Sequence, residues 1–297
     1  MPKSMNHAKK KRFPLVLVPL LLVFSLLIIH RLLEKNALTT ADSPVVALSE
    51  KLKHQPDTAL KQQWQTILHH QDSDVNIGVY NALTKQTTIY NSNTSATYPT
   101  ASIVKVSVLA NLLRMSQSDD ASLSPAEKTL AESMIVDSDN DATTTLLNTY
   151  QDGYTGPDDL FNALHMTQSK MNPDAWGMTT TTAQDQLKLL NALAYGQKSP
   201  LNRSDRHYVL HLMANVNPDQ DWGISKGIPD NATIQLKNGW LDSDDDDGWI
   251  VNSIGHIQTK DSNYTIAVLT TGNATEAAGI DLIERLSSAT ARQLKVN

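Results

Sequence analysis

The chain has 297 residues, a formal net charge of −6 and no cysteine. This length fits one large domain or two small ones, and the absence of cysteine excludes disulfide bonds, thiolate zinc sites and a cysteine nucleophile. The charge is uneven: residues 1–12 carry five lysine or arginine side chains and no acid, and taking +5 from −6 leaves −11 for the remainder. A basic segment ahead of an acidic remainder favours a membrane topology signal over nucleic-acid binding, so we expect no nucleic-acid partner.

Residues 13–29 are uncharged and dominated by leucine and valine. As a helix this segment is about 26 Å long, and Leu32 and Leu33 extend it toward the ~30 Å of a bilayer core. We expect a basic cytoplasmic tail at 1–12, a transmembrane signal-anchor at 13–33, and a single-pass protein of the cell membrane whose remainder is extracellular. The alternative is secretion after signal cleavage, although no clear Ala-x-Ala site follows.

Residues 34–56 are polar and aperiodic and are predicted to be a linker. Asp57 is then a candidate N-cap for a helix with one apolar face. Two runs rich in β-forming residues follow, Val75–Tyr80 and Thr87–Tyr90, and the turn between them predicts a hairpin. Beyond the hairpin, apolar residues recur at the helical period to about residue 222. The helices expected there are Ser102–Met115, Pro125–Val136, Asp141–Tyr150, Asp158–Leu164, Ala183–Tyr195 and Ser204–Met213.

The strand pattern returns after Pro229. Its expected strands are Thr233–Lys237, Trp249–Ile257 and Tyr264–Thr270. Asn273 and Glu276 are spaced as a capping box that opens a last helix. Strands on both sides of a helical middle predict an α/β (α+β) fold at 57–297: an antiparallel sheet flanked by N- and C-terminal helices, with an all-helical lobe at about 102–222 inserted between its second and third strands. A cleft between two lobes is a favoured place for a small-molecule site.

Ser102 and Lys105 lie three residues apart at the start of the first helix of this lobe, so their hydroxyl and amine share one face. A serine hydroxyl is a weak nucleophile until a neighbouring base takes its proton, and a desolvated lysine can be that base. The helix is apolar nearly all round, which predicts a central, buried position. The spacing alone arises roughly once by chance in a chain of this length, so the pair needs further support.

Two further motifs supply that support. A Ser-Asp-Asn run at 138–140 lies between two predicted helices, and a Lys-Asn-Gly run at 237–239 ends a predicted strand. A second serine hydroxyl extends a proton path, an asparagine amide can orient an acylamino group, and a second lysine attracts a carboxylate. Glycine at 239 leaves room for a substrate to lie along the strand.

In this order and setting the three motifs resemble the S-x-x-K, S-D-N and K-T-G elements of class A β-lactamases and penicillin-binding proteins. The resemblance covers Asp57 to the C-terminus and implies a β-lactamase/transpeptidase-like fold. It also implies that Ser102 is the acylated nucleophile, that Lys105 is its base or proton relay, and that Ser138 is the shuttle to the leaving nitrogen.

The resemblance implies a binding role for five residues. Asn140 would contact the substrate amide, and Lys237 would anchor the substrate carboxylate with Asn238 and Gly239 beside it. The backbone N–H groups of the nucleophile and of Trp240 would form the oxyanion hole.

The chain departs from the family pattern at four points. Asn238 stands where threonine or serine is usual, and Trp240 replaces a small residue, so its side chain is expected to narrow the site or form an aromatic wall. Residues 207–284 contain no arginine to assist carboxylate binding, and residues 133–275 contain no glutamate. Class A enzymes use a glutamate on a loop between the second and third motifs to hydrolyse the acyl-enzyme. In this chain Asp174 is the only carboxylate that could plausibly replace it.

The resemblance implies a serine hydrolase that forms an acyl-enzyme on Ser102 and hydrolyses β-lactams, without metal or organic cofactor. Two alternatives stay open: a D-Ala-D-Ala carboxypeptidase or penicillin-binding protein acting on acyl-D-Ala-D-Ala ends of cell-wall peptides, and a slowly deacylating sensor. The i, i+4 pair His207 and His211 is interpreted as a solvated helix face, because no third ligand is evident. The acidic run Asp242–Asp247 lacks EF-hand spacing and is interpreted as a solvated turn that could favour cationic or peptide substrates.

Overall fold

The computed structural model describes residues 58–243 and 248–296, all within one unit of the chain, Pro56–Asn297. The predicted basic tail, signal-anchor and linker lie outside the described residues, as do Asp57 and most of the acidic run. Within 58–243 and 248–296, no helix combines the length and the apolar composition that crossing a membrane requires.

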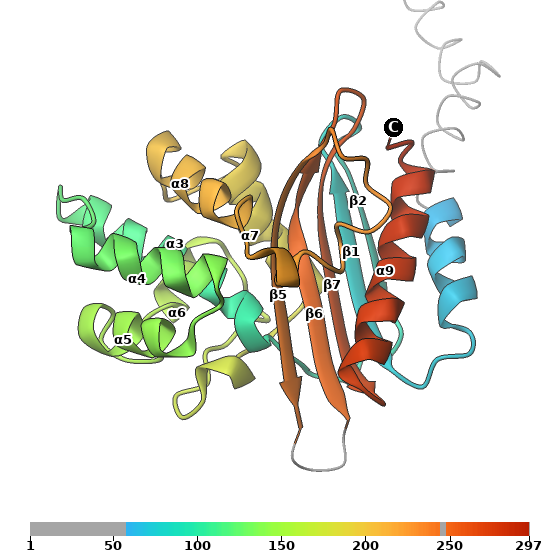
Figure 1. Cartoon of the computed structure of the whole chain (residues 1–297), viewed down its shortest axis with the longest axis horizontal. Helices are drawn as coiled ribbons and strands as arrows, with labels where there is room; N and C mark the ends of the chain where they lie inside the picture. Colours follow the sequence, from blue (N-terminus) through green and yellow to red (C-terminus); the bar gives the residue numbers. More distant parts are fainter. Residues whose placement is uncertain (1–57, 244–247, 297) are drawn as a thin grey trace, which may run out of the picture. The chain divides into compact units, whose positions relative to one another are not determined.

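A five-stranded antiparallel sheet forms the centre of the fold, in the order β2-β1-β7-β6-β5 (Figure 1). Its strands are β1 (Asp74–Asn81), β2 (Gln86–Asn91), β5 (Thr233–Asp242), β6 (Trp249–Gln258) and β7 (Asn263–Asn273). The middle strands β6 and β7 are buried on both faces along nearly their whole length, because helices cover the sheet from both sides. This explains why apolar and polar side chains do not simply alternate along either strand.

One face of the sheet is covered by a helix at residues 58–68 and by α9 (Glu276–Gln293) (Figure 1). These two helices are joined where Trp64 Nε1 donates a hydrogen bond of 3.0 Å to Thr290 Oγ1. The helical lobe lies on the other face, where α7 packs on β1 and β7. Its helices are α3 (Val104–Ser118), α4 (Pro125–Val136), α5 (Asn140–Tyr150), α6 (Asp158–Ala163), α7 (Ala183–Tyr195) and α8 (Arg203–Met213). The predicted antiparallel sheet with flanking helices and an inserted helical lobe is therefore confirmed.

Three local predictions need correction. Ser102 does not lie in an α-helix but in a 3₁₀ turn, η1 (Ala101–Ile103), which runs directly into α3. Strand β5 continues past Gly239 to Asp242, because residues 233–242 pair with β6 throughout. The cap of α9 is Thr275, whose side chain accepts from Ala278 N, while Asn273 is turned inward and donates to the Trp249 carbonyl.

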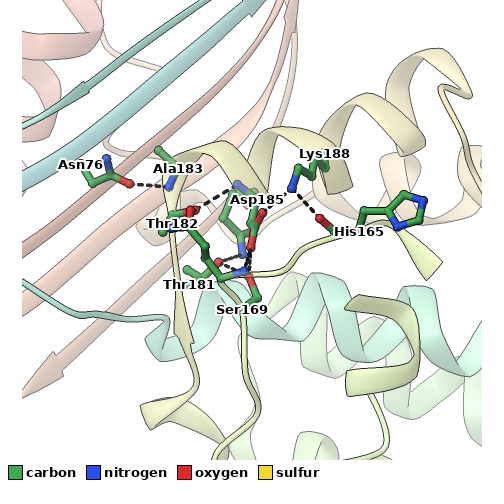
Figure 2. A network of polar contacts seen from close by, with 10 residues as sticks. Asn76, His165, Ser169, Thr181, Thr182, Ala183, Asp185 and Lys188 are labelled. Atoms are coloured by element: carbon green, nitrogen blue, oxygen red, sulfur yellow. Dashed lines mark hydrogen bonds and ion pairs between the residues drawn. The ribbon is translucent and has the colours of Figure 1, made fainter. Parts of the chain in front are cut away.

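A buried polar cluster fixes the start of α7, and Figure 2 shows its members. Asp185 is only 1% exposed, and it accepts hydrogen bonds from Gln168 N at 2.7 Å and from Ser169 Oγ at 3.0 Å. Lys188, one turn along the helix, donates to the same carboxylate at 2.8 Å. Ala183 N donates at 2.6 Å to Asn76 Oδ1 in β1, which ties the helix to the sheet.

Candidate active site

The turn that carries Ser102 is held from both lobes. Strand β3 (Tyr98–Pro99) pairs with β4 (Thr180–Thr181), a small sheet that the sequence did not predict. Asn252 on β6 donates from Nδ2 to the carbonyls of Pro99 at 2.8 Å and Thr100 at 3.0 Å. Ala101 has φ +45°, a left-handed conformation that costs a non-glycine residue about 1–2 kcal/mol. These contacts hold the strained turn and leave Ser102 partly exposed.

Lys105 lies in the first turn of α3, and its side chain is completely buried. Its Nζ donates to the Ser138 carbonyl at 2.7 Å and lies within hydrogen-bond distance of Ser102 Oγ at 2.8 Å and of Ser138 Oγ at 3.1 Å. A fourth contact, of 2.7 Å, goes to Asn140 Oδ1. Burial lowers the pKa of Lys105 to about 7, although the nearby charge of Asp139 opposes the shift. At pH 7 about half of the amine is therefore in the neutral form.

The hydrogen-bond partners of Lys105 orient that neutral amine. A carbonyl oxygen and an amide oxygen can only accept, so the Ser138 carbonyl and Asn140 Oδ1 together occupy two N–H groups. A neutral amine has no third hydrogen, and its lone pair is left facing the hydroxyls of Ser102 and Ser138. A hydroxyl can donate, so the arrangement lets Lys105 take a proton from either serine.

Ser138 lies in the short connection between α4 and α5, as expected. Its φ is +57°, and this left-handed turn brings both its carbonyl and its hydroxyl to Lys105. Asp139 next to it caps α5 by accepting from Ala142 N at 2.8 Å. The cap fixes the path of the chain through the connection.

Lys237 is also completely buried, and its Nζ donates to Ser138 Oγ at 2.9 Å and to the Asn238 carbonyl at 3.0 Å. Burial is the main cause that lowers the pKa of Lys237 well below its usual value, and the charge of Lys105 lowers it further. None of the ion pairs in the described part of the chain includes either lysine. The Ser138 hydroxyl thus bridges two buried amines.

Gly239 on β5 passes directly beside the Ser102 turn. A Cβ at this position would lie 2.6 Å from Ser102 N, so no larger residue fits without moving backbone. The close approach brings the β5 backbone next to the predicted oxyanion donor on Ser102.

Strand alternation puts the side chains of Asn238 and Trp240 on the face of β5 opposite to Lys237 and Gly239. The Asn238 amide donates to the carbonyls of Gln220 at 2.7 Å and of Trp222 at 3.0 Å, and the side chain is only 1% exposed. Trp240 stacks edge-on against Trp222 with ring centroids 5.8 Å apart. The Trp240 ring thus packs against Trp222, and the predicted oxyanion role of Trp240 concerns only its backbone N–H.

A pocket of about 530 Å³ adjoins Asn140. Asp174 lies on its wall and is exposed, and Trp176 lies on the same wall. The Lys105 amine sits over the Trp176 ring, 5.1 Å from its centroid. Sequence motifs indicate only Asp174 in this stretch, because nothing in the local pattern predicts that the Trp176 ring faces Lys105.

No group of side chains suited to hold a metal ion occurs among residues 58–243 and 248–296. His207 and His211 lie on α8, away from the contacts described above.

Comparisons with known proteins agree with this geometry. The sequence profile of a family described as "Beta-lactamase enzyme family" matches residues 59–128 and 125–294. A class A beta-lactamase from Bacteroides cellulosilyticus is similar in structure, with a TM-score of 0.70 at 16% identity over 82% of this chain and 99% of that one. A beta-lactamase from Streptosporangium roseum gives 0.67 at 19% identity, over 81% and 100%. The protein PBP-A gives 0.67 at 20% identity, over 80% and 96%, and a variant of it was solved as an acyl-enzyme complex with penicillin G. No curated protein sequence matches the chain.

Proposed function

Because the chain belongs to the beta-lactamase enzyme family, a group of penicillin-recognising serine enzymes, we propose that it is a serine hydrolase acylated on Ser102 by β-lactams or by the cell-wall peptides they mimic. The observation that carries the proposal is the hydrogen-bonded series from Ser102 through Lys105 and Ser138 to Lys237. The series joins three separate segments of the chain, at 102–105, at 138 and at 237, so the fold is needed to complete it.

Acylation follows from the orientation of the Lys105 amine. Its lone pair accepts the Ser102 proton while Ser102 Oγ bonds to the substrate carbonyl carbon, and the carbonyl electrons move to the oxygen. The N–H groups of Ser102 and Trp240 would stabilise that oxyanion, and the close approach of β5 at Gly239 supports this placement.

Collapse of the intermediate needs a proton on the departing nitrogen. Ser138 Oγ would donate it and recover one from the ammonium of Lys105, which returns to the neutral amine. Lys237, on the other side of Ser138, would face the substrate carboxylate. The substrate carboxylate would oppose the lowering of the Lys237 pKa, because an opposite charge favours the charged form of an amine.

The residues of the site support hydrolysis of the acyl-enzyme less well than they support its formation. No glutamate occurs at 133–275, and the exposed Asp174 is the only carboxylate of the 172–178 segment. We therefore propose a long-lived acyl-enzyme. This favours a penicillin-binding, D-Ala-D-Ala-directed or sensing role beside slow β-lactam hydrolysis.

The full-length chain incubated with a chromogenic cephalosporin tests the proposal when both colour and intact protein mass are followed. We expect one equivalent of colour and a persistent mass adduct, absent from Ser102→Ala. Sustained turnover without an adduct would instead assign a β-lactamase. An unmodified wild-type protein with no colour would refute acylation on Ser102.

We also propose, from residues 13–33 alone, that the enzyme is exported and stays anchored in the cell membrane. Protease added to intact cells should then remove the domain at 57–297 while the anchor sediments with membranes. Recovery of the domain in the medium would assign the secreted alternative.

A further inference from the structure

We propose that Trp176 is a positioning residue that acts on the chemistry through Lys105: its ring covers one flank of the amine, excludes water there and stabilises the ammonium form. The inference deepens the proposed function, because it concerns the base of the same site. Nothing in the three family motifs assigns a role to this residue.

The ring is held in place by contacts that do not involve Lys105. Trp176 Nε1 donates to Thr144 Oγ1 of α5 at 3.2 Å. The 3₁₀ turn η2 (Trp176–Met178) is anchored at its end, where Thr100 N donates to the Thr179 carbonyl at 2.7 Å. The half-buried indole therefore has a fixed position beside the Ser102 turn.

The polar partners of Lys105 come from Ser102, Ser138 and Asn140, and the ring supplies an apolar contact. An indole face has two opposite effects on an amine. As an apolar cover it removes water and favours the neutral form, and as a π-system it attracts the cation. The first effect prepares the base, and the second stabilises the ammonium that forms when the Ser102 proton is taken.

The charged groups that face Lys105 come from two other elements. Asp139 at the start of α5 favours the ammonium, and Lys237 on β5 disfavours it. Asp174 lines the same pocket as the ring. These three groups stay unchanged in variants of Trp176, so a shift in such variants reports the ring itself.

Two substitutions separate the two effects. Trp176→Leu keeps an apolar cover but has no π-face, so the Lys105 pKa should fall by about half a unit. Trp176→Ala admits water, so the same pKa should rise by about one unit or more toward the ordinary lysine value. Trp176→Phe keeps an aromatic face, loses the second ring and the bond to Thr144, and is the matched control, expected to remain closer to wild type than the other two variants.

The readout is an NMR titration of the full-length protein labelled with carbon-13 at the lysine ε position, in which the Lys105 signal is assigned by its loss in Lys105→Met. Opposite shifts for leucine and alanine, with phenylalanine closer to wild type than either, support the proposal. Shifts in the same direction, or no shift in any variant that retains the wild-type circular dichroism spectrum, overturn it. The titration uses unreacted protein, so it stands whether or not Ser102 is acylated. The pH profile of acylation tests the proposed function separately, and its acid limb should move with the Lys105 pKa.

Discussion

At the start of α7, Asp185 is buried among two neutral donors and the ammonium of Lys188, and every contact compensates its charge (Figure 2). At the start of α3, Lys105 is buried just as deeply but receives no carboxylate, and a second buried lysine lies across one hydroxyl from it. Both clusters sit where the helical lobe meets the strands. The surroundings of Asp185 stabilise its charged form, whereas the surroundings of Lys105 favour its neutral form.

This difference distinguishes the Asp185 cluster, which has a structural role, from the Lys105 cluster, which is suited to catalysis. A paired and fully hydrogen-bonded carboxylate fixes its surroundings and gains nothing by changing its protonation state. A buried amine whose hydrogen-bond partners are all neutral oxygen atoms has a pKa close to the working pH, which is the property a general base requires. Substitutions in the two clusters should therefore affect stability and activity in opposite ways.

Lys105→Met gives the largest expected effect. Acylation should fall by about 10²–10⁴-fold, the usual contribution of general base catalysis. Stability at pH 7 should rise by roughly 1–3 kcal/mol, because the drop in the Lys105 pKa from 10.5 to about 7 sets an upper limit of about 5 kcal/mol and the lost hydrogen bonds offset part of it. Denaturant unfolding and single-turnover acylation measure the two quantities.

The pH dependence of stability tests whether Lys105 destabilises the folded protein. The folded pKa lies below the unfolded value, so the unfolded state binds more protons between about pH 7 and 10.5. Lys105 should therefore make the free energy of unfolding of the wild type increase with pH in that window. Lys105→Met should abolish this contribution. A variant that is less stable than wild type at pH 7 would contradict the comparison.

Asp185→Ala should act in the opposite direction, lowering stability by about 1–3 kcal/mol because it removes the acceptor shared by Gln168 N, the Ser169 hydroxyl and Lys188. Asp281→Ala is the matched control: Asp281 pairs with Arg285 on α9 but is 67% exposed, and its loss should cost at most about 0.5 kcal/mol. Urea unfolding of both variants gives the comparison. Equal costs would show that the Asp185 cluster is not a structural one.

Ser138→Ala should reduce acylation by about 10²-fold, because it breaks the bridge between the two amines. Ser107, one half-turn after Lys105 on α3, is the control: its buried hydroxyl has no partner, and Ser107→Ala should leave rate and stability nearly unchanged. Stopped-flow acylation with both variants tests this. A loss for Ser107→Ala as large as for Ser138→Ala would make general packing the cause.

The two clusters also differ in how far sequence could predict them. Periodicity gave the strands and helices to within a few residues because burial on one face or both faces determines it. Ser102, Lys105, Ser138 and Lys237 could be nominated from their motifs, and the structure brings their side chains together. The left-handed turn at Ala101, the hydrogen bonds of the Asn238 amide and the ring over Lys105 depend on contacts between distant segments. Periodicity carries no record of such contacts. The cap of α9 was mispredicted because Asn273 and Thr275 are both good caps and only packing chooses between them.

Asp174→Asn gives the smallest expected effect and bears on hydrolysis of the acyl-enzyme. Asp174 is exposed on the pocket wall, and the ring of Trp176, not a carboxylate, is what lies against Lys105. A general base must reach the water it activates within hydrogen-bond distance, and a solvated side chain held by no partner is poorly placed for this. The rate at which Asp174→Asn loses the adduct should therefore differ from the wild-type rate by no more than about threefold. Asp242→Asn, which changes another carboxylate of the same pocket, is the control and should behave alike. Mass spectrometry over time measures the adduct. A decrease of about 100-fold in the deacylation rate of Asp174→Asn alone would identify Asp174 as the deacylating base. The site would then contain a catalytic carboxylate in addition to Lys105.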